Sequence, residues 1–105
     1  MAQFSVYRNK NPRTKATFPL LVDVQSELLE PLVTRVVIPL TRTSALTRKP
    51  VSHLTPQISF GGDTYLLMTP QLAGINRTEL GALAGSVAQD RQVILAAVDF
   101  LLTGF

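Results

Sequence analysis

The sequence predicts a mainly β fold of several antiparallel strands followed by one C-terminal α-helix. Two patterns indicate it. Short runs that alternate apolar and polar residues recur over the first two-thirds of the chain, and the last fifth changes to helical spacing. The 105 residues are 46% apolar and 16% charged, which is a globular composition. We therefore expect a single domain over residues 1–105.

Three early runs have the period of two that is typical of strands, and they cover residues 3–8, 20–25 and 36–40. One face of each run is expected to consist of Phe4 and Val6, then of Leu20, Val22 and Val24, then of Val36, Ile38 and Leu40. The residues expected on the opposite faces of the first two runs are Ser5, Tyr7, Leu21, Asp23 and Gln25. Pro39 has no amide proton to donate to a ladder, so it predicts a sheet edge or a bulge.

The clearest local prediction is a β-hairpin. Ile58 and Phe60 lead into Gly61-Gly62-Asp63, and the strand pattern returns over residues 65–69. A glycine pair between two such runs is a strong signal for a two-residue turn.

The last fifth of the chain predicts a helix that begins near Ser86 and ends at Gly104, where a glycine suits the C-terminal cap. Ser86 and Gln89 have the spacing of a capping box, and Asp90 suits the positive end of the helix dipole. The stripe expected to face the core repeats at helical spacing and consists of Val87, Ile94, Val98 and Leu101.

This helix is apolar on nearly every side between residues 93 and 102, which is more than one small domain can cover. It either packs between two subunits or forms a contact surface for another protein. Asp99 opposes the helix dipole in the last turns, at a cost of roughly 0.3–1 kcal/mol. Asp99 is therefore either a functional residue or the partner of a nearby arginine. The apolar girdle that predicts a dimer consists of Leu95, Ala97, Phe100 and Leu101.

The net charge is +3, from ten Lys and Arg against seven Asp and Glu. Basic residues gather in two stretches, at residues 8–15 and 42–49. Such stretches are either ordinary solvated loops or surfaces that attract nucleic acid or an acidic partner. The longest apolar run is too short for a membrane span, and no signal peptide opens the chain, so we expect a cytoplasmic protein that does not enter a membrane.

Little in the chain is typical of an active site. The sequence has no cysteine and a single histidine, His53, so it lacks the usual zinc ligands, and no serine lies in a nucleophile elbow. We expect no catalytic residue, no metal and no cofactor. Asp23, Glu27 and Glu30 are expected in a solvated loop. In that loop the adjacent Leu28 and Leu29 either form an exposed anchor or include one residue that covers the core.

Six segments, in this order and spacing, resemble the CcdB toxins of bacterial ccd toxin–antitoxin modules. They are QFSVYRNK near the start, LVDVQSELLE at 21–30, RVVIPL at 35–40, SHLTP at 52–56, MT at 68–69 and DFLLTGF at the end. The resemblance implies an SH3-like barrel of antiparallel strands, shared with MazF-like toxins, and a small accessory sheet. It also implies a homodimer with the C-terminal helix at its interface.

The function implied by this resemblance is that of a toxin and not of an enzyme. Toxins of this family bind the DNA gyrase A subunit and trap the enzyme on cleaved DNA. A cognate antitoxin, CcdA-like here, neutralises the toxin and with it represses the operon. Contact with DNA would thus be indirect, through the toxin–antitoxin complex.

The family's gyrase-binding positions correspond to three sets of residues in this chain. They are Ser26, Leu28 and Leu29 after the Asp-Val-Gln motif, then Gln92, Ala96, Asp99 and Leu102 on the helix, and finally Thr103, Gly104 and Phe105. The chain departs from the family at the tail, which usually ends Trp-Gly-Ile, and at Asp99, where asparagine is usual. For the antitoxin, the resemblance indicates Tyr7 and Arg8, and the two basic stretches would suit an acidic tail.

Two other functions remain open for this fold. One is a MazF-like endoribonuclease, although the Gly-x-Glu and Arg-Pro stretches typical of those enzymes are not found. The other is a chromosomal homologue that binds an antitoxin but no longer poisons gyrase, which would fit the altered tail.

Overall fold

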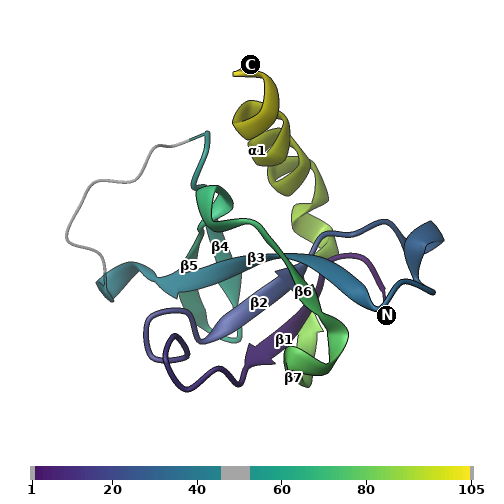
Figure 1. Cartoon of the computed structure of the whole chain (residues 1–105). Helices are drawn as coiled ribbons and strands as arrows, with labels where there is room; N and C mark the ends of the chain where they lie inside the picture. The colour runs from purple at the N-terminus through teal and green to yellow at the C-terminus, as the bar shows by residue number, and fades with distance from the viewer. Residues whose placement is uncertain (1, 46–52, 105) are drawn as a thin grey trace.

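The computed structural model describes residues 2–45 and 53–104. In Figure 1 these residues form a curled antiparallel sheet, a half-barrel, from which one helix rises toward the C-terminus. The strands are β1 (Ser5–Asn9), β2 (Leu20–Asp23), β3 (Thr34–Arg42), β4 (Gln57–Phe60), β5 (Asp63–Leu67), β6 (Ala73–Asn76) and β7 (Leu80–Ser86). The helix is α1 (Arg91–Thr103). The predicted fold class is confirmed.

Strand β3 organises the sheet, whose order is β4-β5-β3-β2-β1-β7 with β6 also beside β3. Along one side β3 pairs with β2, and along the other it pairs first with β6 and then with β5. Pro39 lies opposite Leu21 in this central strand, and its carbonyl accepts the Met68 amide at 2.9 Å. The expected edge or bulge is therefore wrong. The missing amide is tolerated because it falls between the residues of β3 that pair with β6 and those that pair with β5.

The predicted hairpin is confirmed. Strands β4 and β5 pair antiparallel, and Phe60 lies opposite Asp63. Gly61 and Gly62 form the turn with positive φ angles of 59° and 85°. Two consecutive residues with positive φ are what a two-residue hairpin turn of this hand requires, and glycine adopts them at no steric cost.

Strands β6 and β7 were not expected from the sequence. Strand β7 is LGALAGS, and glycine and alanine are poor strand formers on their own. The pairing of β7 with β1 explains one glycine, because a Cβ atom at Gly81 would lie 2.6 Å from the Arg8 carbonyl oxygen. Close approach of the two backbones thus requires a residue without a side chain there.

The helix begins later than the capping box predicts. Ser86 is the last residue of β7, and its Oγ accepts the Ala88 amide at 3.2 Å. A 3-10 turn, η5 (Ala88–Asp90), intervenes, and α1 starts at Arg91. The predicted end is confirmed, because Gly104 adopts a φ of 78° and its amide donates to the Phe100 carbonyl at 2.9 Å.

Apolar side chains are buried on both sides of the sheet. The larger cluster contains Val6 of β1 and Leu20 and Val22 of β2, and α1 contributes Ile94 and Ala97 to it. Tyr7 and Leu21, expected on the opposite face, are also buried, in a second cluster with Val37 and Leu80. The helix stripe needs correction as well: Ala97 is buried, Val98 is half-buried, and Leu101 is 37% exposed.

Among the residues that the structure describes, no helix is both long and apolar enough to cross a bilayer.

Candidate functional site

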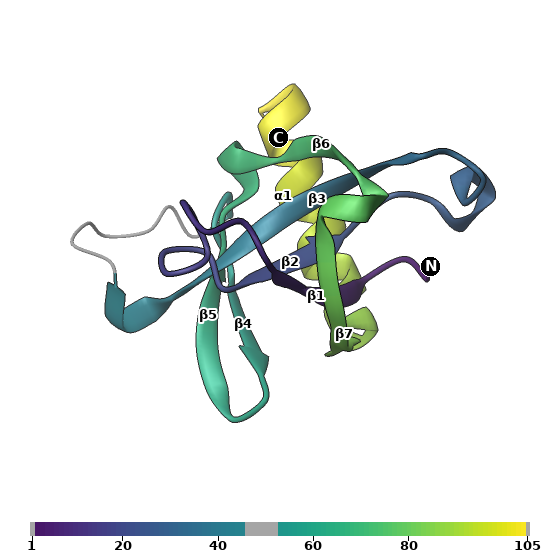
Figure 2. The same cartoon turned by 60° about the horizontal axis from the view of Figure 1, so that its bottom comes forward.

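The residues predicted to bind a partner lie in two exposed regions. The first is the η1 loop, residues 26–33, named for its 3-10 turn Glu27–Leu29. The second is the outer face of α1, which we define by Gln92, Ala96, Asp99 and Thr103. Figures 1 and 2 show the loop extending from one side of the sheet and the helix rising from its top.

The η1 loop presents large apolar side chains to solvent. Leu28 is 91% exposed and Leu29 48%, and no residue of the turn is buried. Both leucines therefore belong to the exposed anchor, and neither covers the core. Ser26 holds the turn, because its Oγ accepts the Leu28 amide at 3.2 Å. Sequence reasoning did not single out Leu32 and Val33, which are also exposed in this loop.

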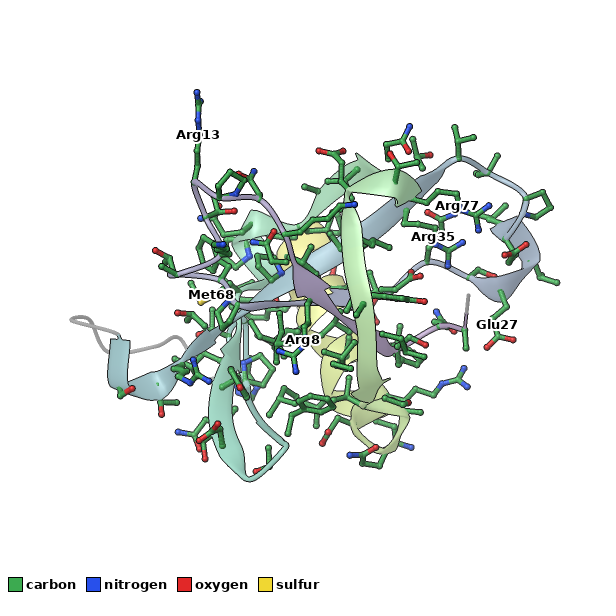
Figure 3. The ribbon with its side chains drawn as sticks, turned by 90° about the horizontal axis from the view of Figure 1, so that it is seen from below. Arg8, Arg13, Glu27, Arg35, Met68 and Arg77 are labelled. Atoms are coloured by element: carbon green, nitrogen blue, oxygen red, sulfur yellow. The ribbon has the colours of Figure 1, made fainter. Side chains whose placement is uncertain are left out.

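Polar side chains tie the η1 loop to the sheet. The Gln25 side chain donates to the Leu29 carbonyl at 3.2 Å, and Arg77 pairs with Glu30 at 3.0 Å. Asp23 was expected in a solvated loop, and this is wrong, because it is fully buried in an ion pair with Arg35. Figure 3 shows Arg35 and Arg77 at the same end of the molecule as Glu27 of the loop.

The outer face of α1 follows helical geometry. Gln92, Ala96, Asp99 and Thr103 are separated by four, three and four residues, which places them on one side of a helix. All four are exposed, and they lie opposite the buried Ile94 and Ala97. The part of the chain that the structure describes therefore leaves this side of the helix uncovered.

Asp99 has no counter-charge within this surface. No arginine or lysine among the described residues forms an ion pair with it, so the alternative of a salt bridge finds no support there. The Thr103 hydroxyl donates to the Asp99 backbone carbonyl at 2.7 Å. This hydrogen bond supplies a donor to one of the last carbonyl groups of the helix. The exposed carboxylate remains near the negative end of the helix dipole.

The last turns of α1 project beyond the sheet (Figure 1). Leu102 is 74% exposed, and Leu101 is exposed although it lies on the same side of the helix as Ile94 and Ala97. The predicted apolar girdle is therefore only partly exposed. Ala97 belongs to the core, Leu95 and Phe100 are half-buried, and Leu101 is exposed.

At the tail, Gly104 turns the backbone out of the helix, and Phe105 lies outside the described residues. His53 is exposed, and its ring centroid lies 6.2 Å from that of Phe100. A lone imidazole against an aromatic ring offers packing, with no acid–base partner among the contacts described for it.

Over residues 3–104, nearly the whole chain, the sequence matches the family described as CcdB protein. The chain belongs to the CcdB family. The resemblance identified from the sequence is thus confirmed, and the curled antiparallel sheet with one C-terminal helix is consistent with the fold of that family. CcdB proteins are toxins of toxin–antitoxin systems, which gives this chain its general function.

The two regions predicted to bind gyrase lie apart on a single copy of the chain. In both Figure 1 and Figure 2 the η1 loop lies to one side of the sheet, and the C-terminal end of α1 lies apart from it. One copy therefore does not bring Leu28 and Leu29 together with Leu102 and Thr103.

The residues assigned to the antitoxin differ in accessibility. Tyr7 is only 8% exposed and packs in the second core cluster, which leaves it little surface to offer, whereas Arg8 is exposed. Arg8 lines a hollow with Arg42, and the guanidinium of Arg42 lies 5.6 Å from the centre of the Tyr65 ring. Arg13, in the first basic stretch, extends away from the body of the protein (Figure 3).

Within residues 2–45 and 53–104, no three His, Cys, Asp or Glu side chains gather in a way that could hold a metal ion.

Proposed function

We propose that this protein binds the A subunit of DNA gyrase and traps the enzyme on cleaved DNA. The observation that carries the proposal is the exposure of Leu28, 91%, on a turn that the sheet holds in place. Large apolar side chains at this degree of exposure are typical anchors of protein–protein interfaces, where a few residues supply most of the binding energy.

The gyrase-binding surface comprises the η1 loop, the outer face of α1 and the tail. Leu28, Leu29 and Leu102 supply apolar area, while Gln92 and Asp99 supply hydrogen-bonding groups. Ser26 sets the turn that carries the leucines. Ala96 allows close approach of the partner, and Thr103, Gly104 and Phe105 complete the surface.

The protein acts as a homodimer in this proposal. Leu101 and Val93 are exposed on α1, and the end of the helix extends past its own sheet. A second copy would cover part of this apolar surface. It would also combine binding regions that lie apart on one copy.

The antitoxin binds in part at the hollow lined by Arg8 and Arg42. The guanidinium groups of Arg8 and Arg42 suit an acidic peptide, which would compete with Asp63 of the same hollow for its exposed 3.7 Å ion pair with Arg42. The antitoxin neutralises the toxin, and the complex of the two represses its own operon, so the toxin meets operator DNA only through that complex.

The test is a cleavage assay with purified protein, gyrase and supercoiled plasmid. We expect linear DNA to accumulate only when both proteins are present. Cleavage of RNA by the protein alone would instead establish a MazF-like endoribonuclease. Binding to the antitoxin, without either activity, would establish a homologue that no longer poisons gyrase.

A further inference from the structure

We propose that the buried ion pair of Asp23 and Arg35 positions the η1 loop for partner binding, and that it acts through Gln25. All three are positioning residues, since none of them is exposed enough to touch a partner. The identity of the partner, the gyrase A subunit, rests on the function proposed above.

The ion pair fixes one carboxylate in the interior. The Arg35 Nε donates to Asp23 Oδ2 at 2.9 Å, and Nη2 lies 2.8 Å from the same oxygen. Both side chains are 0% exposed. The other oxygen, Asp23 Oδ1, accepts the backbone amide of Gln25 at 3.0 Å. The position of the arginine therefore determines where the backbone leaves strand β2.

Gln25 carries this constraint into the loop. Its Oε1 accepts the Val36 amide of strand β3 at 2.9 Å, and its Nε2 donates to the Leu29 carbonyl at 3.2 Å. The side chain thus bridges a central strand and the end of the 3-10 turn. Leu28, between the two fixed points of Ser26 and Leu29, is held outward.

A buried ion pair is by itself weak evidence that the pair stabilises the fold. Two charges removed from water lose their hydration, and a well-packed apolar pair of similar volume is often as stable or more stable. Arg35 Nη1 has no hydrogen-bond partner among the described residues. What the pair supplies, and an apolar pair would not, is an acceptor, Asp23 Oδ1, for the hydrogen bond that the Gln25 backbone amide donates.

A loop that is already ordered loses less conformational freedom on binding, and affinity rises accordingly. The double variant Asp23→Leu/Arg35→Met and the single variant Gln25→Met remove this order by different routes. Each would be measured for melting temperature, for backbone order parameters of Leu28 and Leu29 by NMR, and for affinity to a gyrase A fragment.

We expect both variants to stay folded, with order parameters falling from about 0.85 toward 0.6 or below. Affinity for the gyrase A fragment should fall at least about tenfold, as expected when a preorganised anchor becomes mobile. If the double variant does not fold, Gln25→Met decides, because it leaves the ion pair intact.

Thr41→Val is the matched control. Thr41 is also buried in strand β3, and its hydroxyl donates to the Thr17 carbonyl at 2.8 Å, away from the η1 loop. This variant should leave the order parameters and affinity unchanged.

Unchanged order parameters in Gln25→Met would overturn the inference, whatever happens to binding. If the wild-type protein does not bind gyrase, the proposed function fails, while the order parameters still decide whether these residues position the loop.

Discussion

At the scale of single residues, the side chains proposed to bind a partner are those that the fold leaves exposed. Leu28 is the clearest case, since its exposure is nearly complete while the backbone around it is hydrogen-bonded. Leu83 on β7 provides a comparison, because it is also a large exposed leucine, 65%, but lies outside the proposed binding surface.

Leu28→Ala should therefore weaken gyrase binding and leave the fold unchanged. Truncation of an interface anchor costs about 2 kcal/mol or more, which is roughly a thirtyfold loss of affinity. Leu83→Ala should bind as the wild type does. The measurement is calorimetric titration of a gyrase A fragment. Equal affinities for the two variants would remove the η1 loop from the binding surface.

Asp99 makes a prediction about stability. Its carboxylate lies near the C-terminal end of α1, where negative charge is unfavourable, so Asp99→Asn should raise the free energy of unfolding by about 0.3–1 kcal/mol. Asp90 lies at the opposite end of the same helix, and Asp90→Asn should lower it. Urea unfolding at low ionic strength would show the two shifts. Shifts of the same sign would mean that the dipole is not the cause.

At the scale of elements, local patterns predicted the structure wherever the determinants were local. The Gly61-Gly62 hairpin and the Gly104 cap were predictable, because each depends on the backbone freedom of residues at the turn itself. The helix start predicted from the capping box at Ser86 is wrong, because Ser86 pairs with β1 as the last residue of strand β7.

Contacts between residues that lie far apart in the sequence could not be predicted from local patterns. Asp23 and Arg35 lie on neighbouring strands, and only the register of β2 against β3 brings them together. The same holds for strands β6 and β7, whose glycine-rich and alanine-rich sequences become strands only by pairing. For the candidate site, the sequence showed the unusual pair of adjacent leucines, Leu28 and Leu29. It did not show the hydrogen bonds of Asp23, Arg35 and Gln25 that lie beneath them.

The contact between β1 and β7 can be tested at Gly81. A Cβ atom at this position would lie 2.6 Å from the Arg8 carbonyl oxygen, which is backbone and cannot move away by a side-chain rotation. Gly81→Ala should therefore destabilise the fold by about 1–3 kcal/mol. Gly74→Ala on strand β6 is the control, since no atom would lie within 4 Å of its Cβ. Thermal unfolding of both variants would decide. If the two variants have the same melting temperature, strands β1 and β7 can move apart slightly without loss of stability.

The end of α1 can be tested by removing residues 103–105. The core of the helix is complete at Ile94 and Ala97, so the truncated chain should melt close to the wild type. It should lose gyrase-dependent DNA cleavage, because the tail belongs to the proposed binding surface. Antitoxin binding should persist in part, since Arg8 and Arg42 are retained. A folded truncated protein that still traps gyrase would show that the tail does not contribute.

At the scale of the whole molecule, the fold leaves apolar surface that a second copy would cover. Buried apolar side chains pack on both faces of the sheet, yet the last turns of α1 extend past it and leave Leu101 exposed. The η1 loop lies away from this helix end on the same copy (Figure 2). A surface that uses both regions at once is more easily built from two chains than from one.

Sedimentation at micromolar protein should therefore give about twice the chain mass of 11.5 kDa. Leu101→Glu should shift the equilibrium toward the monomer, because a charge would be buried in the interface without a partner. Leu83→Glu should not, since that leucine lies on β7, away from the end of the helix. The monomeric variant should also lose gyrase trapping, because each copy would present only one part of the surface. A wild-type protein that sediments as a monomer, and still traps gyrase, would show that one copy is sufficient.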